Sequence, residues 1–278
     1  MDQGNFSRAA SHCNVSQPTL SAGIAKLERE LGASLFLRSN QRVQLTTSGS
    51  LFLDHARRIE IEFNNAHRAM AVTNTVPLLQ IGILSSIPSD LIGRAVRAAA
   101  IVDRSAPIEM VYGTERELIG QLARGRIDVG LTLVERGSDR FLELPLYSEG
   151  YGVFLPLDHP LASREHVAAE DLADNPMIVR RHCEALSETS RHFTERGIRP
   201  RFSLRSTNDD QVLKMVAAGL GVTVMPMSYE HPGVTRTRLS GFEVKRSIGF
   251  VFAHEAEHLR NDMPPLMTEI GAVTSVPD

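Results

Sequence analysis

The chain is poor in cysteine and has no long apolar run. Its 278 residues include two cysteines, Cys13 and Cys183, which fall in different expected domains and so argue against a disulfide framework. No apolar run approaches the ~20 residues that span a membrane, and the N-terminus lacks a signal-peptide pattern. These absences exclude a disulfide-stapled secreted domain and a membrane protein. We therefore expect a cytoplasmic location and no membrane partner.

Most sequence signals of an enzyme are also missing. We find no G-x-S-x-G elbow, no phosphate-cradling glycine loop and no paired-cysteine zinc motif. The run HEAEH, from His254 to His258, does satisfy H-E-x-x-H, which on a helix presents two imidazoles to zinc. It follows an expected strand and precedes NDMPP, so little helix remains for a third ligand. We predict no catalytic residue, no metal site and no cofactor, and a zinc metallopeptidase using His254 and His258 is the remote alternative.

Charge is divided unevenly along the chain, whose net charge is −3. Residues 1–73 hold eight Lys or Arg against six Asp or Glu, a net charge of +2, whereas the remainder holds 22 against 27, a net charge of −5. A basic excess favours a polyanion such as DNA, so the first part is the expected nucleic-acid-binding part. The hydrophobic content of 42% is ordinary for a globular protein.

Residues 6–45 have the pattern of a winged helix-turn-helix. The apolar residues of a first helix lie on one face and are Phe6, Ala9, Ala10 and Cys13. Asn14 ends that helix, and Ser16 offers its hydroxyl as the N-cap of a second helix with Pro18 in the first turn. The apolar residues of the second helix also share a face and are Leu20, Ile24, Leu27 and Leu31. Gly32 ends the second helix.

In such a pair the N-terminal residues of the second helix reach base edges in the major groove. The candidate DNA-binding residues on this helix are Ser16, Gln17, Pro18, Thr19, Ser21 and Lys26. Gln17 can pair bidentately with adenine, and the hydroxyls of Thr19 and Ser21 suit base edges or phosphates. The segment Leu35 to Leu45 predicts a β wing, in which Arg38 and Arg42 flank a polar tip and contact phosphates.

A coiled-coil pattern follows Thr47. Its seam alternates by four and three and comprises Phe52, Ala56, Ile59, Phe63, Ala66 and Met70. We predict a linker helix over residues 47–73 that joins two protomers, as two half-sites on DNA require. An amphipathic helix packed on its own chain is the alternative, since fewer than four heptads are present. Residues 73–77 then break the helix and act as a hinge.

Residues 74–278 alternate strand and helix patterns, which predicts an α/β fold with a largely parallel sheet. The expected strands are Leu78–Leu84, Pro107–Tyr112, Asp128–Val134, Met177–Val179, Phe202–Ser206, Val222–Met225 and Ser247–Ala253. The expected helices are Asp90–Val102, Glu115–Arg124, Cys183–Arg196, Asp209–Ala218 and Leu266–Val273. A crossing near residues 155–160 divides them into subdomain I, about 78–156 and 248–278, and subdomain II, about 157–247.

Two α/β halves joined by crossing strands form a cleft, and ligands bind at the carboxyl ends of the strands. The turns expected to line it are polar and comprise Ser85-Ser86, Gly113-Thr114 and Ser206-Thr207-Asn208. Helix N-termini present free N–H groups and a partial positive charge, so a small carboxylate or similar anion is the expected ligand. Helix capping alone is the alternative for each of these side chains.

Two runs carry a resemblance to a known family, FSRAASHCNVSQPTLSAGIAKLERELGASLFLRSNQRVQLTTSG and MVAAGLGVTVMP. They resemble the DNA-binding module and the effector domain of LysR-type transcriptional regulators, and the similarity extends from Asp2 to about Val273. The resemblance implies a periplasmic-binding-protein-like effector domain in a homodimer or homotetramer. It also implies double-stranded operator DNA, a small-molecule effector and RNA polymerase as partners.

The resemblance also implies effector-binding residues. Ser86 and Thr114 match positions that commonly contact effectors, and Thr207 is close to a third. Arg181 and His182 begin the first helix of the second half and add charge, although single residues of this kind are more often solvated. The predicted effector set is Ser85, Ser86, Thr114, Arg181, His182, Thr207 and Asn208.

Cys183 lies near the reactive cysteine of the peroxide-sensing branch of this family, which pairs with a second cysteine farther along. No second cysteine follows here, so we do not expect a disulfide switch of that kind. A helix N-terminus and Arg181 would lower the pKa of the thiol, whereas burial would make it inert. We favour a small buried cysteine.

Two departures from the family pattern bear on DNA binding. Family members usually begin with a further helix before the residues matching Gly4-Asn5-Phe6, where this chain has only Met1-Asp2-Gln3. We expect the true start to lie upstream, and Phe6, Ala9 and Leu27 to lose apolar cover without that helix. Ala22-Gly23 stands where an arginine commonly follows the serine, which weakens phosphate contacts. An effector-binding protein with impaired DNA binding is therefore the alternative.

We predict a LysR-type regulator in which residues 1–46 bind DNA, 47–73 join protomers and 74–278 bind the effector. It reads an interrupted palindrome and performs no chemistry. A ligand that prefers one arrangement of the DNA-binding heads shifts the population toward it.

Overall fold

The computed structural model describes residues 5–37, 43–71, 78–137 and 140–274. The chain forms two compact units, Met1–Ala71 and Val72–Asp278. Within the described residues no helix is both long and apolar enough to cross a membrane.

The first unit contains the predicted helix pair and wing. Its elements in order are α1 (Phe6–His12), α2 (Gln17–Leu31), β1 (Phe36–Leu37), β2 (Gln44–Leu45) and α3 (Thr47–Ala71). The Ser16 hydroxyl accepts a hydrogen bond from the Thr19 N–H at 3.3 Å, which confirms the predicted N-cap. Gly32 ends α2 in the left-handed conformation, with φ at 65°. Local capping chemistry therefore fixes both ends of the second helix.

Side-chain contacts tie the wing to the helices of this unit. The Glu28 carboxylate on α2 accepts the Leu35 N–H at 2.6 Å and the Phe36 N–H at 3.2 Å. The rings of Phe6 and Phe36 meet edge to face, with centroids 5.4 Å apart. A Cβ at Gly49 would lie 2.0 Å from the Leu35 carbonyl oxygen, so only glycine lets α3 pass this close to the residue that precedes β1.

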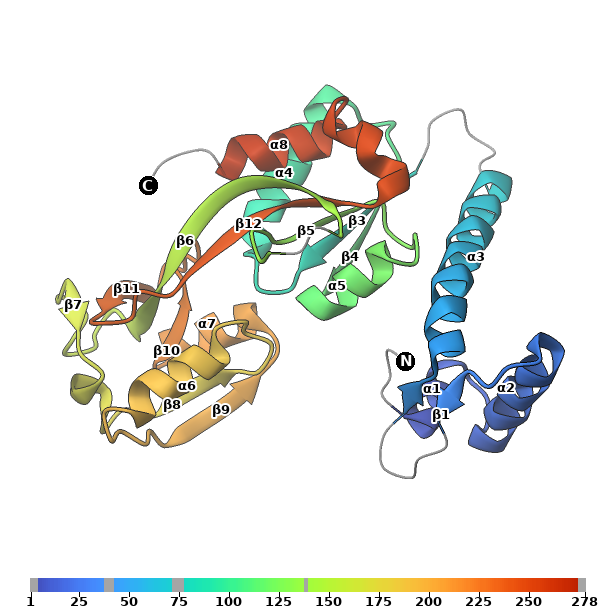
Figure 1. The fold of residues 1–278 in the computed structure, drawn as a ribbon. Coiled ribbons are helices and arrows are strands. Elements are labelled where there is room, and N and C mark those ends of the chain that lie inside the picture. Colours follow the sequence, from blue (N-terminus) through green and yellow to red (C-terminus); the bar gives the residue numbers. More distant parts are fainter. Residues whose placement is uncertain (1–4, 38–42, 72–77, 138–139, 275–278) are drawn as a thin grey trace. The chain divides into compact units, whose positions relative to one another are not determined.

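Subdomain I of the second unit is a sheet with helices on both faces. Its parallel strands are β3 (Leu79–Leu84), β4 (Ile108–Gly113) and β5 (Val129–Leu133). The helices α4 (Ser89–Val102) and α8 (Pro265–Thr274) pack together on one face, and α5 (Glu115–Leu122) covers the other (Figure 1). A buried apolar core that includes Ile81, Leu131 and Phe250 lies between these layers.

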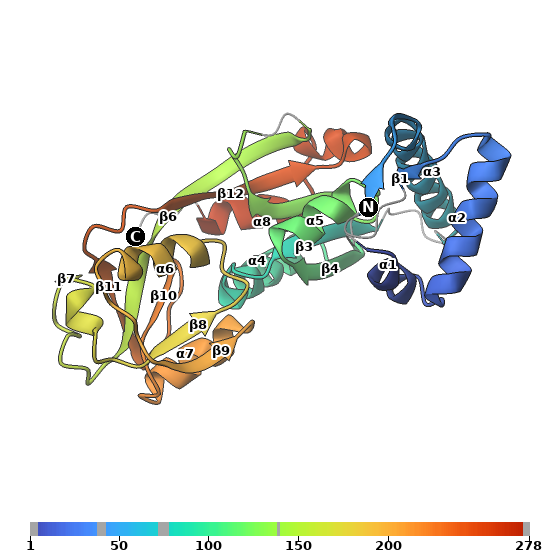
Figure 2. The same ribbon diagram turned by 60° about the horizontal axis from the view of Figure 1, so that its bottom comes forward.

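Subdomain II is built around a second set of strands, seen best in Figure 2. Its elements are β7 (His166–Val167), β8 (Met177–Arg180), α6 (Leu186–Thr194), β9 (Phe202–Ser206), α7 (Asp209–Ala217), β10 (Thr223–Pro226) and β11 (Val234–Leu239), with the 3₁₀ turn η1 (Glu170–Leu172). The strands β8 and β9 pair in parallel, whereas β10 and β11 pair antiparallel to the end of β6. Separate apolar clusters fill the two sides of this subdomain.

Two long antiparallel strands, β6 (Leu142–Pro156) and β12 (Lys245–Phe252), run side by side from one subdomain to the other (Figure 1). Because β12 also pairs antiparallel with β5, the main sheet is mixed rather than largely parallel. The sequence did not predict β6, β7 or β11. Proline and glycine interrupt the apolar pattern of β6, and most of its first nine residues are half-buried, so no alternation marks the strand.

Candidate functional site

The N-terminal end of α2 carries a polar surface formed by the predicted DNA-reading residues. Ser16, Gln17, Pro18 and Thr19 are exposed and Ser21 is half-buried. The Gln17 amide donates to the Ser21 hydroxyl at 3.1 Å, and the hydroxyls of Ser16 and Thr19 lie 2.7 Å apart. In the structure these side chains therefore form hydrogen bonds with one another.

The three basic candidates of this unit lie farther from that helix end or outside the described residues. Lys26 is exposed, and its ammonium lies 3.9 Å from the Glu30 carboxylate. A pair this exposed contributes little to stability and leaves the cation available to a phosphate. Arg38 and Arg42 lie outside the described residues.

The predicted effector residues of subdomain I have different surroundings. Ser86 is fully buried in the β3–α4 turn, and its hydroxyl donates to the Glu184 carboxylate at 2.8 Å. Its half-buried neighbour Ser85 donates its backbone N–H to the Gly113 carbonyl. Thr114 forms a capping box with Glu117 at the start of α5, as the capping alternative predicts.

The predicted effector residues of subdomain II also differ in their surroundings, from half-buried to exposed. His182 is half-buried, and its Nε2 lies 3.3 Å from the Asp209 carboxylate. Arg181 and Thr207 are exposed, and the Arg181 backbone N–H bonds the Ser206 carbonyl. Asn208 caps α7 by accepting the Gln211 N–H at 2.9 Å. Of the seven candidates, Ser86 has its side chain in a buried polar network that joins the subdomains, whereas His182 contacts a buried carboxylate within subdomain II.

One centre of that network is Arg246, at the start of β12. Its side chain is 2% exposed, and its Nε and Nη2 donate to Glu149 Oε1 at 3.0 and 2.8 Å. Its Nη1 donates to the Ser86 hydroxyl at 2.9 Å and to Glu184 Oε1 at 2.5 Å. The guanidinium therefore joins a turn of subdomain I to a carboxylate of subdomain II through a crossing strand.

Glu184 is the carboxylate shared by this centre. Tyr151 on β6 donates its hydroxyl to Glu184 Oε1 at 2.7 Å. Burial acts to raise the pKa of Glu184, but Arg246 and the Tyr151 hydrogen bond outweigh it, so that the pKa lies below its ordinary value. Burial and Glu184 raise the pKa of Tyr151. At neutral pH the group is a carboxylate held by neutral and cationic donors.

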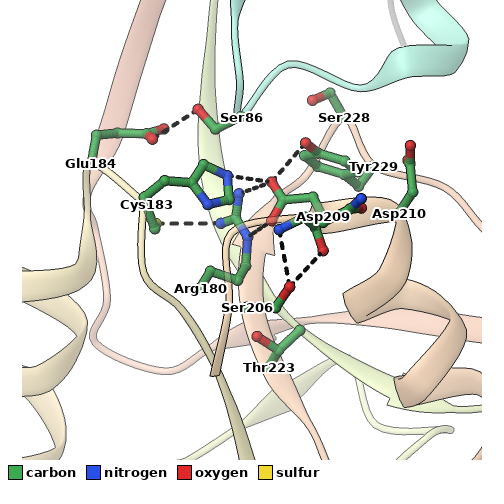
Figure 3. A network of polar contacts seen from close by, with 12 residues as sticks. Ser86, Arg180, Cys183, Glu184, Ser206, Asp209, Asp210, Thr223, Ser228 and Tyr229 are labelled. Atoms are coloured by element: carbon green, nitrogen blue, oxygen red, sulfur yellow. Dashed lines mark hydrogen bonds and ion pairs between the residues drawn. The ribbon is translucent and has the colours of Figure 1, made fainter. Parts of the chain in front are cut away.

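Arg180 is the second centre, at the end of β8 (Figure 3). It makes a bidentate pair with Asp209, in which Nε and Oδ1 are 2.6 Å apart, and the Tyr229 hydroxyl donates to Asp209 Oδ2 at 2.8 Å. Burial acts to raise the pKa of Asp209, but Arg180 and then His182 outweigh it and hold that pKa well below the ordinary range. The pair is satisfied on both sides and fixes the start of α7 against β8.

Cys183 lies beside this pair, and its sulfur accepts a hydrogen bond from Arg180 Nη1 at 3.3 Å. Burial raises the pKa of the thiol despite the opposing effect of Arg180. The sequence placed Cys183 at the start of a helix, but α6 begins at Leu186, so the thiol lies outside its first turn. The thiol is therefore protonated at neutral pH.

Sequence reasoning missed most of the charged residues of this network. They are Glu149, Arg180, Glu184, Asp209 and Arg246. A usable signal was present for the arginines, because Arg180 follows one expected apolar strand directly and Arg246 directly precedes another. A charged residue that continues an apolar strand needs a buried partner. The sequence does not indicate which carboxylates supply it.

A cavity of about 870 Å³ opens beside the network and is lined by both subdomains. Its walls include three residues that belong to or contact the network, Glu149, Ser228 and Tyr229. They also include Asp90 on α4 and Lys214 on α7. The Tyr147 hydroxyl on its wall is buried and has no hydrogen-bond partner among the described residues. The cavity reaches Glu149, the carboxylate that Arg246 holds, whereas Arg246 itself lies behind the cavity wall.

The zinc motif does not form a metal site. Residues His254–Arg260 form a 3₁₀ helix, η2, in which three residues make a turn, so His254 and His258 do not share a face. The His254 ring stacks on Phe141 with centroids 6.1 Å apart. In the part of the chain that the structure describes, no three His, Cys, Asp or Glu side chains are grouped to hold a metal ion.

Both units match protein-family models. Residues 1–50 match the bacterial regulatory helix-turn-helix protein of the lysR family, and residues 75–261 match the LysR substrate binding domain. The second match alone covers more than half of the chain. The helix pair and the two-subdomain unit thus belong to one known combination.

Similar proteins show the same combination. The chain is 30% identical to the hydrogen peroxide-inducible genes activator of Pectobacterium carotovorum over 259 residues, 89% of this chain and 85% of that protein. It is also 30% identical to the transcriptional regulator AlsR of Bacillus subtilis, over 81% of this chain and 76% of that protein. A full-length OxyR variant from Pseudomonas aeruginosa is similar in structure, with a TM-score of 0.59 and 25% identity over 97% of this chain and 90% of that one.

These matches confirm the predicted family and fold class, and nothing in them favours a metallopeptidase or a protein that has lost DNA binding. Regulators of this family bind DNA and small-molecule effectors, form oligomers and are not enzymes. The chain is a LysR-type transcriptional regulator.

Proposed function

We propose that the effector of this regulator is a small carboxylate that binds between the two subdomains, at Ser86 and Arg246. The observation that carries the proposal is that these two buried donors, on different segments, already hold a carboxylate at 2.8 and 2.5 Å. Charge-assisted hydrogen bonds of this kind are strong and specific for planar anions. Of the predicted effector residues, Ser86 is then the one that holds the effector through its side chain.

The cavity beside the network supports this assignment. It reaches Glu149, which shares Arg246 with Glu184, and it is lined by residues of both subdomains. A ligand that enters there contacts both subdomains at once, so its binding energy depends on their arrangement. That dependence is what a population shift requires.

We propose the following division of labour. Residues 1–46 read the operator through the polar N-terminal surface of α2, residues 47–73 join protomers into a dimer or tetramer, and residues 74–278 bind the effector. Gln17 reads adenine, while Lys26, Arg38 and Arg42 contact phosphates. The regulator works in the cytoplasm, and RNA polymerase is its partner at promoters.

Several relatives are named for induction by hydrogen peroxide, which raises thiol oxidation as a second mode of control. Residues 72–278 contain a single cysteine, Cys183, so an intramolecular disulfide within this unit is not available. Its raised pKa also keeps the thiol protonated. We therefore favour ligand binding over thiol oxidation.

Operator binding tests the proposal. An operator is selected from genomic fragments, and the affinity of the wild-type protein is measured by fluorescence anisotropy with acetate, succinate or benzoate present and absent. We expect at least one acid to change the wild-type affinity, and Ser86→Ala to weaken that response while binding the operator normally. A panel without effect on operator binding would refute the carboxylate assignment.

Gln17→Ala should weaken operator binding by roughly 1 to 3 kcal/mol and spare random DNA.

A further inference from the structure

Glu184 makes the contacts that a bound carboxylate ligand would make. Its Oε2 accepts from the Ser86 hydroxyl at 2.8 Å, and its Oε1 accepts from the Tyr151 hydroxyl at 2.7 Å and from Arg246 at 2.5 Å. These donors come from the β3–α4 turn, β6 and β12, whereas Glu184 precedes α6 in subdomain II. The side chain is 11% exposed. The chain thus places one of its own acids between its subdomains.

Glu184 is not needed to neutralise the charge of Arg246. Glu149 already accepts two hydrogen bonds from the same guanidinium, at 3.0 and 2.8 Å, and is 9% exposed. Two carboxylates therefore share one cation. Breaking a buried ion pair is costly because it leaves an unpaired buried charge. Removing Glu184 does not leave such a charge, because Glu149 still neutralises Arg246.

Removing Glu184 would nevertheless leave unused donors. The hydroxyl of Ser86 is 0% exposed and that of Tyr151 belongs to a side chain that is 5% exposed. Both would lose the carboxylate that accepts their protons, and a buried donor without an acceptor is unfavourable. The vacated space would therefore bind a small planar anion.

We infer that Glu184 is an internal occupant of the effector's anion site, and that the effector acts by displacing its carboxylate from Ser86, Tyr151 and Arg246. The inference rests on the carboxylate effector proposed above and names the regulation of that site. With Glu184 in place, the contact from subdomain II to Ser86 is closed. With an external carboxylate in place, Ser86 and Arg246 keep an anion but lose their link to the segment that precedes α6.

Chemical rescue tests the inference. In Glu184→Ala, formate supplies a free carboxylate group, so its addition should raise the midpoint of thermal unfolding saturably, because a ligand that binds the folded state stabilises it. The wild-type protein should show no saturable change with formate, and sodium chloride at equal ionic strength is the control for salt. The double variant Glu184→Ala/Ser86→Ala should bind formate more weakly. Equal formate dependence in wild type and Glu184→Ala would overturn the inference.

A second variant covers the case in which Glu184→Ala does not fold. Glu184→Gln keeps the shape but removes the charge from the internal occupant, so an acid that acts on the wild-type protein should bind the variant about tenfold more tightly. Unchanged affinity would count against displacement. If formate rescues Glu184→Ala but no acid of the panel alters operator binding, the internal occupant stands and the carboxylate effector falls. If an acid of the panel alters operator binding but neither Glu184 variant responds as expected, the carboxylate effector stands and the internal occupant falls.

Discussion

At the scale of single residues, the effector unit depends on two buried arginines, and each is used differently. Arg180 has one carboxylate, Asp209, which it holds through two hydrogen bonds. Arg246 has two carboxylates, Glu149 on the crossing strand β6 and Glu184 in subdomain II. A cation with one partner fixes a structure, whereas a cation with two partners can exchange one of them. Under the proposed function, Arg246 is therefore the centre at which a ligand competes.

Cys183 gives a residue-scale prediction. Because burial raises the pKa of its thiol above the ordinary value near 8.5, the reactive thiolate is scarce at neutral pH and increases as pH rises through the shifted pKa. In Cys13→Ser, which leaves Cys183 as the sole thiol, alkylation by iodoacetamide should accelerate with pH and still be rising above about pH 9. A rate that reaches its plateau by pH 7 would contradict the assignment. The double variant Cys13→Ser/Cys183→Ser provides the background rate.

At the scale of elements, α3 carries an exposed apolar stripe. Ile59, Phe63 and Met70 are 65%, 67% and 86% exposed. Their spacing of four and seven places them along one side of the helix, as the predicted seam requires. An apolar stripe of this length on a surface helix is typical of a helix that pairs with another chain.

Substitution in that stripe tests the dimer helix. Phe63→Asp should convert the protein to monomers, because a charge in the seam would be desolvated without a partner, and light scattering coupled to size-exclusion chromatography measures the mass. Arg58→Asp, on a different side of α3, is the matched control and should keep the oligomer. An unaltered mass for Phe63→Asp would remove this stripe from the interface.

The sequence predicted those elements whose residues carry local signals. The helix ends at Ser16, Gly32 and Asn208 follow from capping chemistry, and β9 follows from the alternation of Phe202 and Leu204 with polar residues. The strand β6 carries no such signal, because its pairing with β12 and β11 is set by residues about 80 or more positions away. The same holds for the site, since Ser86 was predicted from its turn but Glu184, 98 residues away, was not.

At the scale of the whole molecule, the buried carboxylates set the response of the effector unit to acid. The pKa values of Asp209 and Glu184 are lowered on folding. Each group therefore stabilises the folded state above its ordinary pKa, near 4, and loses that contribution as pH falls through the folded pKa. We expect the free energy of unfolding to be steady from pH 7 to about 5 and to fall below about pH 4.

Asp209→Asn separates this contribution from other acid effects. At neutral pH it leaves Arg180 buried without its carboxylate, which should cost about 3 to 5 kcal/mol in urea denaturation followed by circular dichroism. The difference from wild type should shrink as pH falls, because protonation removes the same charge. A difference that stays constant with pH would show that Asp209 does not titrate as described.

The order of the strands also affects how the chain is made. The core of subdomain I combines residues 79–134 with residues 248–270, and about 110 residues of β6 and subdomain II separate β5 from β12. At 5 to 20 residues per second, a ribosome needs roughly 5 to 20 s to synthesise that interval. During this time β3, β4 and β5 are already made, but the edge of β5 that pairs with β12 has no partner strand. Until β12 is made, the nascent chain therefore exposes an unpaired strand edge at which it can pair with another chain.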